Sequence, residues 1–364
     1  MTIIILDFIL NIVYEITKLF KIKKNKITFI SYKSNKLEED FKLIANRLIE
    51  QKKYDLKFIL IKYKKSILGD LLYLINCVMQ VYHINTSSIV LLDYNNYAVS
   101  KFKKKDVKVV QIWHASGAIK KFGNDVKRKY KIKGYDYVLT TSSVWKKYYS
   151  TAFNVEEEKV VELGIPRNDI LFSKSTIERY VKSINYKFPS IRNKKVILFA
   201  PTFRGNYIKG VRYEKIDLEY IQSKLGDDYI IIYKLHPWID DNFIYNSSKV
   251  INANNVSIAK LLSIADYLIS DYSSVIFDFS IFEKPIILYT PDLEEYKENP
   301  GIYLDYENEI PGPICKNEDE IIKTIQKDYF SIEKVKKFKN KFFKYQDELS
   351  TERVVNFIEK LMEA

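Results

Sequence analysis

Residues 267–279 read YLISDYSSVIFDF, and this short stretch passes from an apolar run through a polar turn into a second apolar run. The run at 267–269 predicts a buried strand, and residues 270–274 predict a turn that opens a helix continuing to Phe279. A strand followed at once by a helix is the repeating unit of α/β proteins. The stretch therefore favours an α/β fold.

Comparable apolar runs recur along the chain on both sides of this stretch. Strands are predicted at 27–32, 56–63, 89–92, 107–113, 135–140 and 160–163, and in a second series at 196–200, 229–235, 250–251, 267–269 and 286–289. Many of the runs are continuous Val, Ile, Leu and Tyr, which is typical of parallel strands covered on both faces. Helices are predicted between them, for example at 38–51, 218–224 and 258–265. The pattern predicts two doubly wound, Rossmann-like domains.

The length of 364 residues suits two domains that each bury a core. We predict an N-terminal helix at 1–25, a first α/β domain at 26–185 and a second at 186–364, with a helical tail from residue 321. The best linker candidate is 179–193, which contains Pro189 among mixed charges. Because ligands of open parallel sheets bind outside the carboxyl ends of the strands, we expect the two domains to face a central cleft.

Composition excludes several classes of protein. Hydrophobic residues make up 47% of the chain and charged residues 29%, as in an ordinary globular protein. Cys77 and Cys315 lie far apart without a partner motif, which argues against a disulfide framework or a thiolate metal site and suits a reducing compartment. No GxxxxGK[ST] loop and no strand-borne GxGxxG occurs, so ATP-dependent and dinucleotide chemistry are disfavoured. We predict no metal site.

The net charge of +13 indicates an anionic partner such as phosphate, nucleic acid or a lipid headgroup, with a solvated basic surface as the plainer alternative. The N-terminal stretch MTIIILDFILNIVYEITKLF is mostly apolar and is followed by KIKKNK. Its polar residues Asp7, Asn11, Glu15 and Lys18 fall on one helical face, which fits a bilayer core badly. We predict an interfacial helix with its apolar face in the lipid. A spanning anchor and a plain core helix are the alternatives.

Two of the three histidines follow predicted strands. His114 lies in WHASGAIKKFG after the run at 107–112, and His236 lies in KLHPW after the run at 229–233. A histidine exchanges a proton near neutral pH and also bonds phosphate oxygens. An isolated histidine in such a place is more often a core residue bonded to the backbone. Two placed alike favour a catalytic function.

Other motifs at strand ends carry groups suited to phosphate. The serines of the opening stretch, Ser270, Ser273 and Ser274, join Asp271 at a helix start, where backbone N–H groups favour anions. Simple helix capping by Ser270 or Asp271 is the alternative, but it explains one residue rather than three hydroxyls. Asp278 is positioned to accept from a polyol hydroxyl or to serve as an ordinary helix residue.

Two further motifs complete the set of candidate residues. APTFRGN brings Thr202 and Arg204 to a strand end, where a guanidinium can grip a diphosphate in a bidentate manner, a surface arginine being the alternative. WHASGAIKKFG and GIPRND supply candidates for an acceptor, with a solvated lysine and a capped turn as their plainer readings. These acceptor-side candidates are Gly117, Lys120, Arg167, Asn168 and Asp169.

In order, these segments resemble the CDP-glycerol glycerophosphotransferase family, whose members build or prime teichoic acids. The matching stretches lie between Lys21 and Tyr296 and are KIKKNKITFISY, VVQIWHASGAIKKFG, LGIPRNDILF, ILFAPTFRGN, YKLHPW and ISDYSSVIFDFSIFEKPIILYTPDLEEY. The resemblance implies a GT-B fold, with an acceptor side in the first domain and a donor side in the second. It also implies peripheral attachment at the cytoplasmic face of the cell membrane.

The resemblance further implies a reaction. Glycerol phosphate would pass from CDP-glycerol to an undecaprenyl-diphosphate-linked glycan, with release of CMP and no obligatory cofactor. His114 would act as base, His236 would contact the donor diphosphate, and Ser270 through Ser274 would hold phosphates. WHAS and the KKFG tail look more like primase-type than polymerising members.

Three alternatives stay open from the sequence. CDP-ribitol is used by related members, and a GT-B glycosyltransferase with a nucleotide sugar would share the fold and the diphosphate grip. A non-catalytic nucleic-acid-binding protein is disfavoured, because the basic residues form no stripe with stacking aromatic residues. We therefore expect no nucleic-acid partner, and the sequence leaves the oligomeric state open.

Overall fold

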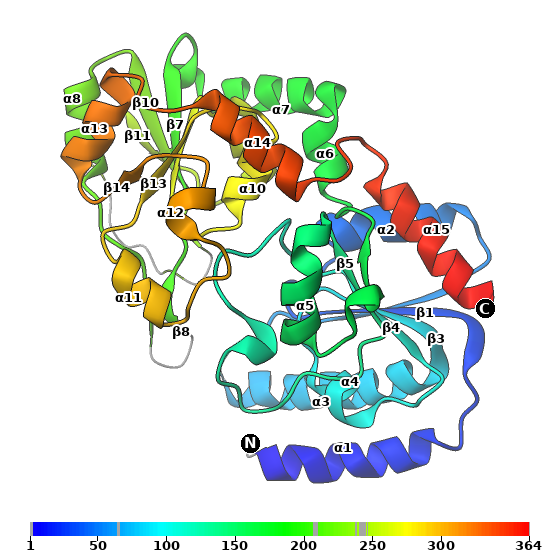
Figure 1. Cartoon of the computed structure of the whole chain (residues 1–364). Coiled ribbons are helices and arrows are strands. Elements are labelled where there is room, and N and C mark those ends of the chain that lie inside the picture. The colour runs from blue at the N-terminus through cyan, green and yellow to red at the C-terminus, as the bar shows by residue number, and fades with distance from the viewer. Residues whose placement is uncertain are drawn as a thin grey trace. The chain divides into compact units, whose positions relative to one another are not determined.

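The computed structural model describes residues 3–63, 66–206, 210–236, 239, 245 and 247–363. The chain forms two compact units, which we call the first and second domains (Figure 1). The first comprises Met1–Ala115, Phe122–Asp169 and Lys344–Ala364, and the second comprises Ser116–Lys121 and Ile170–Phe343.

The first domain contains a six-stranded sheet in the order β2-β1-β3-β4-β5-β6, in which every pair is parallel. Its strands are β1 (Lys23–Ser31), β2 (Asp55–Leu60), β3 (Ser87–Leu92), β4 (Lys108–Gln111), β5 (Tyr137–Thr140) and β6 (Val160–Glu162). Its helices are α1 (Ile3–Thr17), α2 (Glu39–Glu50), α3 (Ile67–Thr86), α4 (Tyr97–Phe102), α5 (Lys146–Phe153) and α15 (Ser350–Glu363), while α6 (Asn168–Phe172) leads into the second domain.

The second domain contains a sheet of the same kind, in the order β11-β10-β7-β12-β13-β14, again parallel throughout. Its strands are β7 (Lys195–Phe199), β10 (Tyr229–Tyr233), β11 (Val250–Asn252), β12 (Tyr267–Ser270), β13 (Ile286–Tyr289) and β14 (Ile314–Cys315), beside an antiparallel hairpin of β8 (Arg204–Asn206) and β9 (Gly210–Arg212). Its helices are α7 (Lys174–Lys187), α8 (Leu218–Leu225), α9 (Ile258–Ile264), α10 (Val275–Ser280), α11 (Leu293–Glu298), α12 (Tyr306–Glu309), α13 (Glu318–Gln326) and α14 (Ile332–Phe342).

Each sheet is buried between helices, as continuous apolar strands require. In the first domain, Phe29 of β1 and Leu91 of β3 share a core with Ile44 of α2. In the second, Ile197 of β7 and Ile269 of β12 share a core with Ile221 of α8. The prediction of two parallel-sheet α/β domains is therefore confirmed, and each predicted strand corresponds to a strand of these sheets.

The two domains divide the chain at other residues than predicted. The C-terminal helix α15 packs on α2 and β3 of the first domain (Figure 1), because Val354, Val355 and Ile358 complete that domain's apolar core. The predicted tail of the second domain is therefore shared between the domains. The linker predicted at 179–193 is wrong, since α7 occupies most of it and packs against α9.

Candidate active site

His114 follows β4 in the first domain and is held by its neighbours. Its ring stacks on Tyr94 with centroids 4.3 Å apart and planes 12° apart. Its Nδ1 lies 2.9 Å from the carbonyl oxygen of Asp93. A carbonyl oxygen only accepts hydrogen bonds, so Nδ1 carries the proton and the lone pair of the neutral ring lies on Nε2. This is the tautomer in which Nε2 can take a proton from a substrate.

The backbone before His114 adopts a conformation that side chains rarely take. Trp113 has φ 66°, in the left-handed region that costs energy for a bulky residue. Its ring stacks on Phe122 at 4.6 Å and meets Phe153 edge-on at 5.1 Å, which fixes the unusual conformation. Strain of this kind occurs where a fold positions a functional group.

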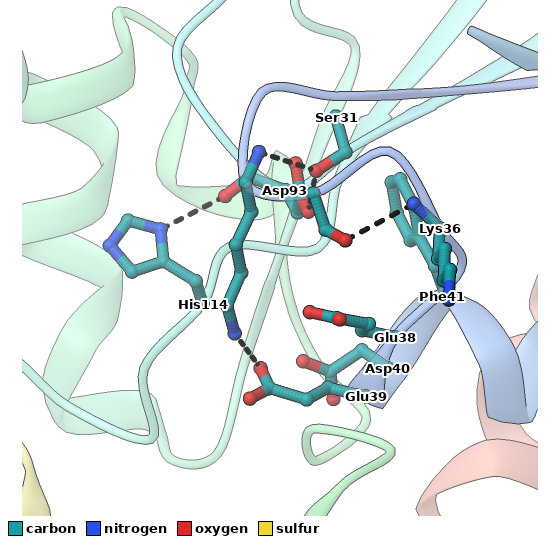
Figure 2. Close-up of a pocket in the computed structure, with 10 residues that line it drawn as sticks. Ser31, Lys36, Glu38, Glu39, Asp40, Phe41, Asp93 and His114 are labelled. Atoms are coloured by element: carbon teal, nitrogen blue, oxygen red, sulfur yellow. Dashed lines mark hydrogen bonds and ion pairs between the residues drawn. The ribbon is translucent and has the colours of Figure 1, made fainter. Parts of the chain in front are cut away.

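A polar pocket opens beside His114, where β1, β3 and β4 end (Figure 2). Parallel strands place such loops at one edge of the sheet, which is where α/β proteins bind ligands. The lining comes from the end of β1, the start of α2 and the residues after β3 and β4, and comprises Ser31, Lys33, Ser34, Lys36, Glu38, Glu39, Asp40, Phe41, Asp93 and His114.

Asp93 lines this pocket with a carboxyl group whose pKa is raised. Ser31 Oγ donates to its Oδ2 at 2.7 Å, while its Oδ1 is buried without a hydrogen-bond partner among the described residues. Burial raises the pKa of Asp93 to about 7. A carboxyl group that exchanges its proton near neutral pH thus adjoins the candidate base. No motif in the sequence marked Asp93, because its role depends on packing against β1.

Arg167 contacts two carboxylates that line this pocket. Its Nη1 lies 3.7 Å from Glu39 Oε2, and its backbone N–H donates to Asp40 Oδ1 at 2.8 Å. Burial raises the pKa of Asp40 to about 6, although Arg167 works against it. Burial would also raise the pKa of Glu39, but Arg167 and an ion pair with Lys33 outweigh it and hold that pKa below its ordinary value.

The other residues of GIPRND have structural surroundings. Both carboxylate oxygens of Asp169 accept backbone N–H groups at the start of α15, from Ser350 at 2.7 Å and Thr351 at 2.8 Å. Asp169 therefore caps that helix, and its contact with an acceptor stays a prediction. Asn168 is buried at the start of α6. Gly117 is buried in the short segment that belongs to the second domain.

In the second domain, His236 follows β10, while Pro237 and Trp238 of KLHPW lie outside the described residues. Its ring lies 4.6 Å from that of Phe203, centroid to centroid. Phe203 comes from the loop after β7, the strand beside β10 in the sheet. His236 and the APTFRGN loop are therefore neighbours at the carboxyl edge of this sheet.

Arg204 has partners within its own domain. Its Nη1 donates to Asp271 Oδ2 at 2.8 Å, and its Nε and Nη2 donate to Asp292 at 2.6 and 3.1 Å. The guanidinium also lies 4.9 Å from the ring centroids of both Tyr272 and Tyr296. Two carboxylates and two rings hold it inside the protein, so Arg204 joins these loops, and its contact with a diphosphate stays a prediction.

Parts of the SDYSS stretch serve the same network. Asp271 is buried and accepts the backbone N–H of Thr202 at 2.8 Å as well as Arg204. Ser270 is buried and donates to the carbonyl oxygen of Ala200 at 2.7 Å. These contacts join the loops after β7 and β12, and direct phosphate binding by Thr202, Ser270 and Asp271 stays a prediction.

Ser273 and Ser274 are half-buried and stay candidates for phosphate. Ser273 Oγ accepts from the backbone N–H of Val275 at 3.4 Å, which is a long contact. Asp278 is buried in α10 and accepts from Ser116 Oγ at 2.5 Å. Its carboxylate therefore ties the segment Ser116–Lys121 to α10, and its bond to a polyol hydroxyl stays a prediction.

A separate apolar surface lies on α1 and α3, which pack side by side (Figure 1). Phe8 of α1 is 68% exposed and Ile67 of α3 is 93% exposed. Asp7 faces Lys101 of α4 and bonds the hydroxyl of Tyr97, so a polar residue of α1 points into the protein. The exposed apolar residues, from the two helices together, are Ile4, Ile5, Phe8, Ile12, Ile16, Ile67, Leu68, Leu71, Leu72, Ile75 and Met79.

The surface on α1 and α3 exposes more large apolar side chains than the surface of a soluble protein usually does. Contiguous exposed apolar patches mark interaction sites. By length and composition alone, α3 is the one helix in the described part of the chain that is long and apolar enough to cross a membrane. Because α1 is mostly exposed, the reading of it as a plain core helix is wrong. The exposed face of α3 was not predicted, since an apolar run of this kind also fits a buried helix.

Two doubly wound parallel sheets, with candidate groups at the strand ends of each, define the class of two-domain α/β enzymes. Within that class, the family described as CDP-Glycerol:Poly(glycerophosphate) glycerophosphotransferase matches residues 12–360, and the chain belongs to it. The protein is accordingly a transferase of this family, as the motifs predicted.

Curated relatives agree with this membership, and a solved structure agrees with the fold. A teichoic acid ribitol-phosphate primase of Bacillus spizizenii is 30% identical over 95% of this chain and 94% of its own length. A teichoic acid glycerol-phosphate primase of Bacillus subtilis is 32% identical over 79% of this chain and 77% of its own. The structure of the wall teichoic acid polymerase TagF superposes with a TM-score of 0.74 at 23% identity, covering 98% of this chain and 95% of that one, which supports the fold.

Proposed function

We propose that the protein transfers glycerol phosphate from CDP-glycerol to a lipid-linked glycan, in the synthesis of a teichoic acid or a related capsule polymer. The observation that carries the proposal is the tautomer of His114 in its polar pocket. Family membership supplies the reaction class. The glycerol-phosphate primase of Bacillus subtilis supports glycerol as the transferred group.

In the proposed reaction His114 is the general base. Nε2 takes the proton of an acceptor hydroxyl while the hydroxyl oxygen attacks the β-phosphorus of CDP-glycerol. The bond from that phosphorus to the bridging oxygen breaks, and CMP leaves with the electron pair. The acceptor gains one glycerol phosphate, and no covalent enzyme intermediate forms. Positioning and charge stabilisation would supply most of the acceleration.

Each of the other candidate groups then has a role. His236 would bond the donor diphosphate, and Ser273 and Ser274 would donate to its oxygens. Arg167 would neutralise an anionic group of the acceptor, because it lies at the rim of the His114 pocket. Asp93 would keep the pocket polar and hold His114 through its carbonyl oxygen.

We propose that the surface on α1 and α3 rests on the cytoplasmic face of the cell membrane. The apolar side chains of both helices would enter the acyl boundary, and the exposed Lys21, Lys23 and Lys24 would meet anionic headgroups. This placement would bring the enzyme to an acceptor carried on undecaprenyl diphosphate. The interfacial helix predicted from the sequence is thus extended to a pair of helices.

The experiment that tests the function measures CMP released by the purified protein from CDP-glycerol, with a lipid-linked disaccharide acceptor in detergent. CDP-ribitol and UDP-sugars run in parallel. Acceptor-dependent CMP release from CDP-glycerol supports the proposal. UDP release from a UDP-sugar, with no CMP from either polyol donor, would assign a glycosyltransferase instead.

CDP-ribitol is the second candidate donor for a specific reason. The ribitol-phosphate primase of Bacillus spizizenii matches this chain over nearly the whole length of both proteins. The reaction and the roles of the residues would be the same with either polyol. CMP release from CDP-ribitol, and none from CDP-glycerol, would assign ribitol phosphate as the transferred group.

A further inference from the structure

The segment Ser116–Lys121 is built into the second domain by contacts along its length. Ser116 Oγ donates to Asp278 Oδ1 at 2.5 Å, and Lys120 forms an antiparallel bridge with Ile302. Both ends of the segment are thus fixed to the domain that carries His236. The direction of the Lys120 side chain is set by this backbone.

The Lys120 ammonium lies beside the groups proposed to bind the donor. Its Nζ is 4.4 Å from the centroid of the Phe203 ring, and that ring also contacts His236 at 4.6 Å. Lys120 and His236 are therefore neighbours of the same ring. The sequence placed Lys120 among acceptor-side residues, because it follows His114 along the chain.

In the part of the chain that the structure describes, the Lys120 ammonium forms no ion pair with a carboxylate, although the side chain is half-buried. The nearby Asp271 accepts from Arg204 and from the backbone of Thr202. Burial lowers the pKa of Lys120, Asp271 works to raise it, and Arg204 works to lower it.

A cation removed from water in this way needs an anion, and a contact with one aromatic ring compensates only in part. Arg204 already pairs with Asp271 and Asp292. Among the described residues of these loops, the Lys120 ammonium lacks such a carboxylate and is therefore available to a ligand. It contacts the ring of Phe203, which also contacts His236.

We propose that Lys120 binds the diphosphate of the donor, a nucleoside diphosphate ester, alongside His236. This inference rests on the proposed function and deepens it, because it names the cation that receives the donor. The side chain would contact the phosphate oxygens and stabilise the charge that develops on the departing CMP. Lys120 would then act on the donor, while Arg167 acts on the acceptor.

The test compares Lys120→Met with Lys120→Arg and with Lys121→Met in the full-length protein. Lys121 is the matched control, since it is the next residue, its side chain is exposed, and its backbone N–H bonds Gly301. Calorimetry measures the Kd for CDP-glycerol and for cytidine, which lacks phosphate. The KM values for donor and acceptor are measured on the same preparations.

We expect Lys120→Met to weaken CDP-glycerol binding about 10- to 100-fold, since a charge-assisted bond to phosphate is lost. Cytidine binding should stay within about twofold, Lys120→Arg should restore most of the affinity, and Lys121→Met should resemble the wild type. Equal losses for CDP-glycerol and cytidine would overturn the assignment and indicate a structural lysine. An unchanged donor Kd with a raised acceptor KM would overturn it in favour of the acceptor.

Failure of the proposed function gives a different result. If the wild type binds CDP-glycerol and CDP-ribitol no more tightly than cytidine and releases no CMP, then neither compound is the donor. The proposed role of Lys120 fails with them. If the wild type binds CDP-glycerol more tightly than cytidine, and Lys120→Met keeps the same preference, the role of Lys120 alone is refuted.

Discussion

Replacing Arg204 with Met should destabilise the second domain strongly, because the guanidinium is the shared partner of two carboxylates. Arg204 is 6% exposed and Asp271 is 2% exposed, and their atoms lie 2.8 Å apart. Methionine keeps part of the stem between the two tyrosine rings but removes every hydrogen bond. Breaking a buried pair from one side costs about 3 to 5 kcal/mol, since the other charge is left uncompensated.

This loss of stability can be measured as a fall in the melting temperature, Tm. For a domain of this size, about 1 kcal/mol corresponds to about 2 to 4 °C, so the Tm should fall by about 6 to 20 °C. Differential scanning calorimetry at pH 7 measures it. Arg47→Met is the control, because its pair with Glu50 is exposed and 3.4 Å long, and its loss should cost less than about 1 kcal/mol.

The pH dependence adds a second check. Burial raises the pKa of Asp271 and Arg204 opposes the rise, so the variant should raise this pKa further. A raised pKa in the folded state means that stability is greatest at low pH and is lost as the pH rises through that pKa. Adding Asp271→Asn should recover part of the loss. A Tm within about 2 °C of the wild type at pH 7, with donor binding lost, would refute the structural role and return Arg204 to the diphosphate.

Three further predictions follow from the first domain. The pKa of Asp93, about 7, lies above that of an unfolded chain, so its contribution to stability is complete below about pH 4 and is lost as the pH rises through 7. In the wild type, the free energy of unfolding should fall by about 3 to 4 kcal/mol between pH 4 and 8, and Asp93→Asn should abolish this fall. A Tm that changes with pH in the same way in both proteins would contradict this. Asp169→Ala should lower the unfolding free energy by about 1 to 2 kcal/mol through loss of the α15 cap while the KM for the donor stays constant, and a changed KM would contradict a purely structural role. Phe8→Glu should weaken binding to anionic vesicles about 10-fold or more in a flotation assay, whereas Asn11→Glu, the same charge at another exposed position of α1, should change it little, and equal effects would argue against insertion of the apolar face.

The strands could be predicted because a strand covered on both faces must be apolar along its whole length. Elements that lack this signature were missed: β14 has two residues, and the hairpin of β8 and β9 has three in each strand. Helices were expected between the strands, but the exposed apolar face of α3 could not be predicted, since its apolar residues face outward as well as inward. Periodicity reports burial only where the other side of the element is polar.

Site residues could be predicted as far as chemistry follows from position at a strand end. His114 lies in a pocket at such an edge, and His236 lies at the edge of the other sheet beside the loop after β7. The role of Arg204 could not be predicted, because its partner Asp292 lies 88 residues away. Asp169 caps a helix that begins 181 residues later. Such long-range partners decide whether a polar residue is structural or available to a ligand, and motif spacing carries no information about them.

Acceptor-dependent CMP release from CDP-glycerol by His114→Asn, measured beside the wild type, decides whether His114 is the base. The Kd for the donor is measured on both proteins. If His114 is the base, turnover falls by about 10² to 10⁴-fold while the Kd stays within about twofold, because the base is lost and the donor site is kept. Turnover within about threefold of the wild type, at an unchanged Kd, would show that the acceptor hydroxyl loses its proton without His114 and would contradict the account.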